Sequence, residues 1–289
     1  MNNSKQWSSA TPGYIIFLVD QSGSMGENYI VNPNGNNQNK AEFTALVINR
    51  TINELILAMS AGDKVKDRVF ISIIGYGGQG GNSVDDVRSD YLSAFSDTPL
   101  RTEKVKKKIS DGAGGLVEIE EDMQIFLEPT FPRNGLTPMG EAFEFAKKLI
   151  EGWIDKKPEN PAPVIINVSD GMPYTGGNAN DDVEKAILAA NSIMNINTND
   201  GNPIIFNVHL GQPPFNESKF ESSESKISDE EGKFLFKISS KVPEAYREAA
   251  RKHEFITSED SRGFVSNAGP ETLIKFINFG SSGGSDRLA

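Results

Sequence analysis

The sequence of 289 residues contains no cysteine and only two histidines. Without cysteine, neither a disulfide framework nor a thiolate metal site can form. No apolar stretch approaches the ~20 residues that a membrane-spanning helix needs, and the N-terminal residues 1–13 have no apolar segment like that of a secretion signal. We therefore expect a soluble, cytoplasmic protein that does not insert into a membrane.

Basic residues are scarce relative to acidic ones. The chain has 29 Lys and Arg against 40 Asp and Glu, which gives a formal net charge of −11. An excess of negative charge disfavours a nucleic-acid backbone or an anionic membrane surface as a partner, although it can also serve solubility alone. We therefore expect neither nucleic acid nor membrane among the partners.

Short apolar runs alternate with segments of helical periodicity along the chain. The apolar runs are rich in β-branched residues, as buried parallel strands are; they span Tyr14–Asp20, Arg68–Tyr76, Val164–Ser169, Pro203–Leu210 and, more briefly, Gly263–Asn267. Helices are predicted at Lys40–Ala61, Pro138–Asp155, Asp181–Asn195, Glu231–Arg251 with a break at Pro243, and Glu271–Phe279. This alternation predicts a doubly wound α/β fold, with a mainly parallel central sheet covered by helices on both faces.

The same pattern predicts a single domain over residues 14–280, between an N-terminal extension (1–13) and a disordered tail (281–289). Residues 77–132 are the least regular part. They include a helical patch near Glu103–Ile109 and a segment, Val117–Leu127, that could form an antiparallel edge strand. No linker or internal repeat divides the chain.

Three oxygen-bearing side chains, Asp20, Ser22 and Ser24, follow the first predicted strand at every second position. In a doubly wound sheet, ligands bind beyond the carboxyl ends of the strands, where the strand order reverses. An all-oxygen set suits Mg²⁺, Mn²⁺ or Ca²⁺ rather than Zn²⁺. The same spacing could also be a turn in which side-chain oxygens accept hydrogen bonds from nearby backbone N–H groups.

Four other kinds of site have similar motifs, three of them at Asp20–Ser24 and one elsewhere in the chain. An EF-hand loop needs glycine and glutamate where this chain has Met25 and Val31. A serine-hydrolase elbow needs glycine where Ser22 stands. The run G-x-G-x-x-G at 75–80 matches a dinucleotide-binding fingerprint, but no helix is predicted behind it, so a flexible turn is favoured. A phosphoryl-transfer enzyme with Asp20 as its nucleophile is the enzymatic alternative, although such enzymes as a rule carry a second acid two residues on.

Two further residues extend the pattern. Thr137 lies in a loop at the start of a predicted helix, and Asp170 follows the predicted strand Val164–Ser169. Taken singly, such a threonine is more often a helix N-cap and such an aspartate a turn former. Together with Asp20, Ser22 and Ser24 they would bring two carboxylates and three hydroxyls to one rim of the sheet.

The order D-x-S-x-S, then T, then D resembles the metal-ion-dependent adhesion site of the von Willebrand factor A domain, and the resemblance runs from about residue 14 to residue 280. The stretches TPMGEAFEFAKKLIEGW, PVIINVSDG, FNVHLG and RGFVSNAG are most similar to bacterial intracellular A domains of the tellurium-resistance type, which tend to be encoded beside protein kinases and phosphatases. The resemblance implies that Ser22 and Ser24 bind Mg²⁺ directly, that Thr137 joins them in the ligand-ready state, and that Asp20 and Asp170 act largely through water.

The resemblance also implies a function. One coordination position would be left for a glutamate or aspartate of a protein partner, so a binding module is expected rather than an enzyme. Two departures from the family pattern are insertions near 27–39 and 77–132, which either flank the metal and influence partner choice or are plain surface loops. We expect Glu27–Asn39 or Asp181–Asp182 to contact the surroundings of the partner's carboxylate; the sequence does not indicate an oligomeric state.

Overall fold

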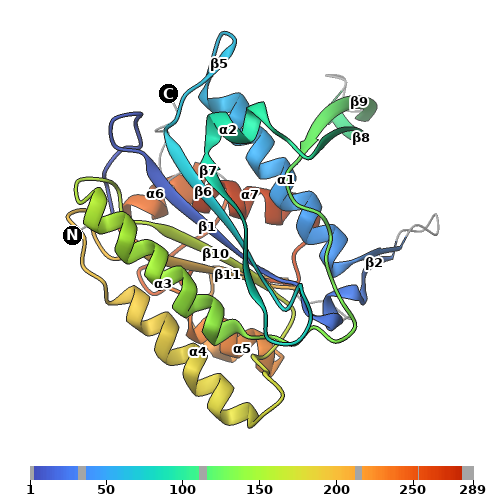
Figure 1. Ribbon diagram of the computed structural model, residues 1–289, viewed down its shortest axis with the longest axis vertical. Helices are drawn as coiled ribbons and strands as arrows, with labels where there is room; N and C mark the ends of the chain where they lie inside the picture. Colours follow the sequence, from blue (N-terminus) through green and yellow to red (C-terminus); the bar gives the residue numbers. More distant parts are fainter. Residues whose placement is uncertain (1–2, 32–36, 111–115, 212–216, 253, 282–289) are drawn as a thin grey trace.

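The computed structural model describes residues 3–31, 37–110, 116–211, 217–252 and 254–281. A seven-stranded sheet runs through the middle of the molecule (Figure 1), in the order β12-β13-β11-β10-β1-β6-β7. Its strands are β1 (Gly13–Asp20), β6 (Val69–Tyr76), β7 (Val84–Tyr91), β10 (Val164–Ser169), β11 (Ile204–His209), β12 (Ser218–Lys219) and β13 (Phe264–Ser266). The predicted doubly wound α/β fold is confirmed.

The central strands are parallel, and the strand at each edge is antiparallel to its neighbour. Strand β1 pairs with β6 on one side and with β10 on the other, so the order along the chain reverses between β1 and β10. All eight residues of β1 are buried. Alternate side chains of a strand point to opposite faces, and both faces are covered here, which explains the unbroken apolar run.

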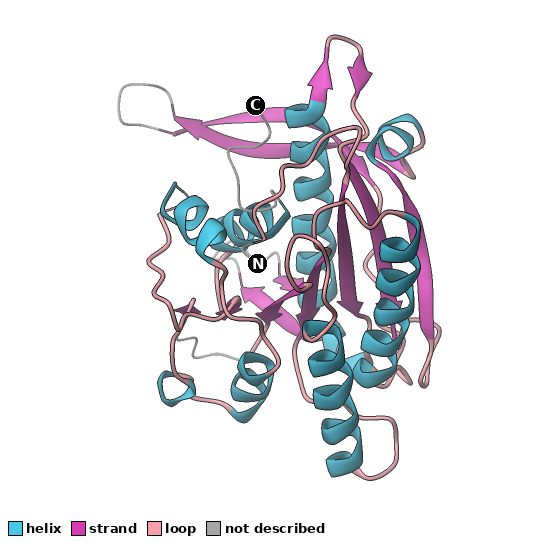
Figure 2. Cartoon of the chain, turned by 90° about the vertical axis from the view of Figure 1, so that its left-hand side faces the viewer, coloured by secondary structure: helices cyan, strands magenta, loops and turns pink. Residues whose placement is uncertain are grey.

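Helices cover both faces of the sheet (Figures 1 and 2). One apolar core joins the sheet to α1 (Lys40–Met59), α2 (Leu92–Asp97), α6 (Glu244–Lys252) and α7 (Pro270–Ser281). The other joins it to α3 (Met139–Lys156), α4 (Ala179–Met194) and α5 (Glu230–Lys237). The five longer predicted helices are confirmed to within a few residues at their ends, and the break predicted at Pro243 separates α5 from α6.

The region 77–132 differs from the prediction. The residues near Glu103–Ile109 are not helical but belong to strand β8 (Arg101–Ser110), which pairs along its whole length with β9 (Leu116–Ile125). Strand β9 was expected, as Val117–Leu127, at the edge of the central sheet. Instead it forms a separate hairpin with β8 beside α1 (Figure 1). The periodicity of a segment can show that it is a strand, but not which other strand it pairs with.

The central sheet has an antiparallel strand at each edge, the short β12 and the longer β7, whose sequence VDDVRSDY was not predicted as a strand. Strand β7 is only partly buried, because an edge strand has one neighbour and an open side. The shorter elements are η1 (Gly23–Gly26), β2 (Asn28–Val31), β3 (Asn37–Asn39), β4 (Ser60–Ala61), β5 (Lys64–Val65) and η2 (Glu224–Lys226).

The ends of the chain were predicted as an extension and a tail. The described part of the extension packs on the domain: the backbone N–H groups of Ser4 and Lys5 donate to Asp200 Oδ1 over 2.7 and 2.8 Å, and Trp7 is buried. The predicted tail beyond Ser281 lies outside the described residues, as do residues 32–36 of the first insertion. Within the described ranges, no helix combines the length and apolar character that crossing a membrane requires.

Candidate metal centre

The five predicted metal residues come from three segments: the end of β1 with the loop behind it, the loop between β9 and α3, and the loop after β10. Asp20 is the last residue of β1, and Asp170 directly follows β10. Because β1 and β10 are parallel neighbours, with Val19 opposite Val168, their ends lie side by side. This is also the point where the strand order reverses, the position at which doubly wound folds bind ligands.

Asp20 is held by hydrogen bonds on both carboxylate oxygens. Oδ1 accepts the backbone N–H of Ser22 over 2.9 Å, and Oδ2 accepts the hydroxyl of Ser169 over 2.6 Å. The first of these is the turn hydrogen bond that the sequence allowed as the ordinary role of this motif. Burial, with a further contribution from the charge of Asp170, raises the pKa of Asp20 to about 7 from its usual 3.8. A bound cation would stabilise the ionised form of this buried carboxylate.

Ser22, Ser24 and Asp170 form a continuous chain of contacts. The hydroxyls of Ser22 and Ser24 lie 3.1 Å apart, and Ser24 Oγ donates to Asp170 Oδ1 over 3.0 Å. Ser24 and Asp170 lie 146 positions apart in the chain, so it is the fold that brings these parts of the motif together. The aspartate is therefore not a mere turn former.

The other oxygen of Asp170 contacts a residue that the sequence analysis did not include. Lys40 Nζ lies 2.6 Å from Asp170 Oδ2 and 3.1 Å from Glu27 Oε2. Lys40 is the first residue of α1, where acidic residues are favoured over basic ones. A lysine at the first position of a predicted helix is unusual, and that could have indicated an acidic partner for Lys40. Ser169, which fixes Asp20, was missed as well, although it directly precedes Asp170.

Thr137 is positioned by its backbone rather than by its side chain. Its N–H donates to Tyr174 O over 2.8 Å and its C=O accepts from Tyr174 N over 3.0 Å, which joins the loop before α3 to the loop after β10. The N-cap of α3 is Pro138, so the alternative of Thr137 as a helix cap is wrong. The side chain lines the same cavity as Ser24 and Asp170.

Glycines let the Thr137 loop approach its neighbours. Gly77 has φ +83°, and a Cβ there would lie 2.2 Å from the carbonyl oxygen of Leu136. The N–H of Gly23 donates to Gly135 O over 3.1 Å, which links the serine loop to the same segment. The glycine run at 75–80 is thus the end of β6 and the start of the turn that leads to β7, and this turn supports the site. The prediction of a turn instead of a dinucleotide-binding loop is confirmed.

A cavity of about 460 Å³ opens above these residues. Ser24, Thr137 and Asp170 line it, whereas Asp20 and Ser22 are nearly fully buried beneath. The rest of the wall includes Glu27, Lys40, Met172, His209, Ser228, Asp229, Glu231 and Asn267. The rim is thus mainly polar, with acidic side chains from the loop after β1 and from the start of α5.

His209 belongs to the wall of this cavity, but its ring is buried and engaged with neighbouring side chains. It is 1% exposed, and its Nδ1 lies 2.9 Å from Ser266 Oγ and 3.5 Å from Asp229 Oδ1. Burial lowers its pKa below the usual 6.5.

The donor set fits a hard divalent cation. Two carboxylates balance a charge of +2, and hydroxyl and carboxylate oxygens are ligands that Mg²⁺, Mn²⁺ and Ca²⁺ accept. In the part of the chain that the structure describes, no three or more His, Asp or Glu side chains gather as a metal-binding group. A cation at this site would therefore depend on the three hydroxyls as well as on Asp20 and Asp170.

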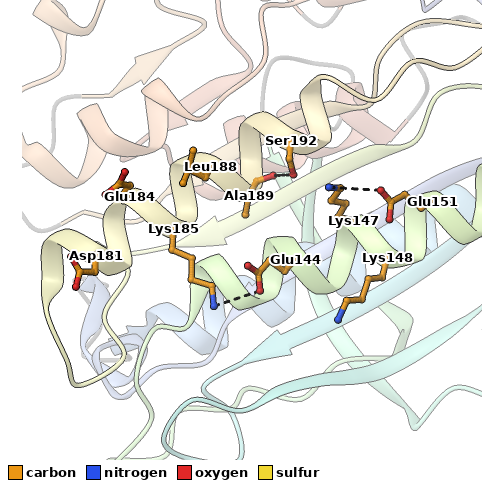
Figure 3. A pocket seen from close by; sticks show the side chains of 10 residues that line it. All are labelled: Glu144, Lys147, Lys148, Glu151, Asp181, Glu184, Lys185, Leu188, Ala189 and Ser192. Carbon is orange, nitrogen blue, oxygen red and sulfur yellow. Dashed lines mark hydrogen bonds and ion pairs between the residues drawn. The ribbon is translucent and has the colours of Figure 1, made fainter.

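A second hollow lies between α3 and α4 and has a volume of about 690 Å³ (Figure 3). Ion pairs run along it, Lys185 with Glu144 at 3.5 Å and Lys147 with Glu151 at 3.8 Å. None of the five predicted metal residues lines it. Asp181, one of the two acids expected near the partner, lies there, whereas Asp182 accepts hydrogen bonds from Thr175.

No protein-family model matches the sequence, and no curated protein matches it. Solved structures similar to this chain include proximal thread matrix protein 1 from the mussel byssus, at 11% identity and a TM-score of 0.43, covering 96% of this chain and 50% of that one. Another structure of that protein is described as having a zinc-occupied MIDAS motif, at 12% identity and a TM-score of 0.43, covering 94% and 48% of the two chains.

Two pilus proteins are also similar. The minor pilin PilB of Streptococcus sanguinis has 10% identity and a TM-score of 0.49, with 99% of this chain and 62% of that chain covered. The vWF domain of the type V pili tip protein Mfa5 of Porphyromonas gingivalis has 12% identity and a TM-score of 0.40, with 93% and 94% covered. The chain thus spans about half the length of the mussel protein and more of the others. These likenesses assign neither a family nor a function.

Proposed function

We propose that this chain is a von Willebrand factor A domain that binds a divalent cation, Mg²⁺ in the first place, and captures a glutamate or aspartate of a protein partner through it. The observation that carries the proposal is the contact of Ser24 Oγ with Asp170 Oδ1 at 3.0 Å, with Ser22 Oγ a further 3.1 Å away. Those contacts assemble the sequence motif at the reversal point of the sheet.

The residues have distinct roles in this proposal. Ser22 and Ser24 offer hydroxyl oxygens directly, and Thr137 adds a third from a separate loop. Asp20 is already engaged on both oxygens, which suits a carboxylate that acts through water. When bound, the cation supplies a positive centre that a carboxylate can complete, and the cavity of about 460 Å³ beside Ser24 and Thr137 leaves room for that group.

A binding module is favoured over a phosphoryl-transfer enzyme. An aspartate nucleophile needs an oxygen that its substrate can reach. Asp20 is 1% exposed and both of its oxygens accept hydrogen bonds, so it is a poor nucleophile in this arrangement. From the sequence resemblance alone we further propose that such a module acts in the cytoplasm of a bacterium, in a stress or signalling complex of the tellurium-resistance type with kinase or phosphatase partners.

Thermal denaturation tests the cation part of the proposal. Mg²⁺ or Mn²⁺ should raise the melting temperature of the wild type relative to EDTA, because a ligand of the native state alone stabilises it by mass action. Ser24→Ala should lose that rise. Ser192→Ala is the matched control, since this serine lies on α4, outside the candidate site, and its hydroxyl donates to Ala189 O. Equal rises in the wild type and Ser24→Ala would exclude the site.

Capture from a native bacterial lysate tests the partner part. A partner should be retained in Mg²⁺, released by EDTA, and lost when one of its Glu or Asp residues is replaced by the amide. Retention in EDTA would show that the partner is recognised through another surface.

A further inference from the structure

The metal centre contains a buried positive charge of its own. Lys40 is 2% exposed, and its ammonium group contacts Asp170 Oδ2 at 2.6 Å and Glu27 Oε2 at 3.1 Å. Burial of a cation is unfavourable, and so is its position at the positive end of the α1 dipole. The ion pairs with these two carboxylates offset the cost of burying the ammonium group there.

The backbone of Lys40 is fixed. Its N–H donates to Glu27 O over 3.0 Å, and its C=O accepts from Thr44 Oγ1 over 2.8 Å. The preceding residue, Asn39, forms a reciprocal capping box with Glu42. The ammonium group is thus held at the site by the start of α1, by its burial and by its two ion pairs.

We propose that Lys40 is a fixed positive charge that tunes the metal centre. It lowers the affinity of the site for the cation and raises the affinity of the cation-loaded site for an incoming carboxylate. This inference rests on the proposed function, because it assumes a cation at the five residues. Lys40 acts here as a specificity-determining residue of the same site.

The charges around the site give the physical reason. With a cation bound, which keeps Asp20 ionised, Asp20 and Asp170 together carry −2, and a divalent cation alone would neutralise that charge. Lys40 shares Asp170 with that cation and repels it, and Coulomb interactions between buried charges are screened far less than those at the surface. A partner's carboxylate, in contrast, is attracted by the cation and by the ammonium group together.

Glu27 opposes Lys40. Its side chain is 50% exposed, against 3% for that of Lys40, so solvent screens its charge more strongly. Replacing Glu27 by glutamine should therefore change the cation affinity in the opposite direction and by less. The two residues provide substitutions of opposite sign at one site.

Calorimetric titration with Mn²⁺ alone tests the inference. Lys40→Met should bind Mn²⁺ on the order of tenfold or more tightly than the wild type, because a nearby like charge is removed. Lys40→Arg keeps the charge and should stay close to the wild type, and Glu27→Gln should bind a few-fold more weakly. Lys241→Met is the control, since its ion pair with Asp260 is exposed and away from the site. Acetate should bind the Mn²⁺-loaded Lys40→Met variant more weakly than the loaded wild type.

The outcomes separate this inference from the function on which it rests. If wild type binds Mn²⁺ and Lys40→Met binds it no more tightly, the role of Lys40 is wrong and the metal centre stands. If wild type binds no Mn²⁺, both fail. Circular dichroism establishes folding of each variant; should Lys40→Met not fold, Glu27→Gln decides, and an unchanged Mn²⁺ affinity in that variant contradicts the inference.

Discussion

Lys40 Nζ lies 2.6 Å from Asp170 Oδ2, and the two side chains are only 3% and 4% exposed. A buried ion pair depends on both partners, because removing one leaves the other charge uncompensated in a poorly solvated place. This contact joins the start of α1 to the residue that follows β10 and places a charged pair in the wall of the cavity at the candidate metal centre.

Asp170→Ala should therefore destabilise the protein in EDTA by about 3–5 kcal/mol, since it leaves Lys40 buried with only the half-exposed Glu27 as a partner. Chemical denaturation measures this difference. Asp260→Ala is the matched control, because its ion pair with Lys241 is exposed, and it should change stability little. A loss as small as that of the control would mean that the buried pair does not stabilise the fold.

Gly77→Ala should be strongly unfavourable. The residue has φ +83°, and an added Cβ would lie 2.2 Å from Leu136 O, so the loop that carries Thr137 would have to move. We expect a loss of about 1–3 kcal/mol in the free energy of unfolding and a weaker response to Mn²⁺. Gly152→Ala, in helix α3 with no atom within 4 Å of the new Cβ, should instead be neutral or stabilising. Similar effects at both glycines would contradict the close approach at Gly77.

The core of this fold could be predicted from the sequence because the physics there is local. Strands such as β1 and β10 are covered on both faces and read as continuous apolar runs, and α3 shows its buried stripe directly. Edge strand β7 could not be recognised in this way, since a half-exposed edge tolerates the charges of VDDVRSDY. Strand β9 was expected, but its pairing with β8 was not, because the sequence of one segment does not show which other segment it pairs with.

The candidate site likewise has residues that the local sequence indicates and residues whose roles depend on distant contacts. Its five residues could be named from their positions after the strands and from a known motif. Lys40 and Ser169 could not, because their roles depend on contacts with residues 130 and 149 positions away. A sequence pattern indicates whether a segment is a helix, a strand or a known motif, but the contacts of its residues with distant segments become visible only in the structure.

His209 predicts a loss of stability in acid. Burial lowers its pKa, although the charges of Asp229, Glu231 and Asp170 oppose this and Lys40 adds to it. Folding therefore favours the neutral imidazole: its contribution is present above pH 6.5, the usual pKa, and is lost as the pH falls through the lower folded value. Denaturation in EDTA between pH 7 and pH 5 measures the loss. The variant His209→Gln, which does not titrate, should lose less stability over this range; an equal slope would exclude His209 as the source.

Thr137→Ala should separate the two halves of the proposed function. Its hydroxyl comes from a loop held by Tyr174 through the backbone, so the substitution leaves the loop anchored. We expect partner binding to weaken more than Mn²⁺ binding, and Thr137→Ser, which keeps the hydroxyl, to resemble the wild type. Calorimetry with Mn²⁺ and capture of the partner give the two readings. A collapse of Mn²⁺ affinity with unchanged partner binding would exclude the role given to Thr137.

Electron paramagnetic resonance of free Mn²⁺ measures cation binding most directly. The signal of the free ion decreases as the ion binds, so a titration gives both the number of sites and their affinity. We expect one site per chain in the wild type and none in the double variant Ser22→Ala, Ser24→Ala, while Ser192→Ala keeps the wild-type site. Absence of a site in the wild type, or its survival in the double variant, would contradict a metal centre at Asp20, Ser22, Ser24, Thr137 and Asp170.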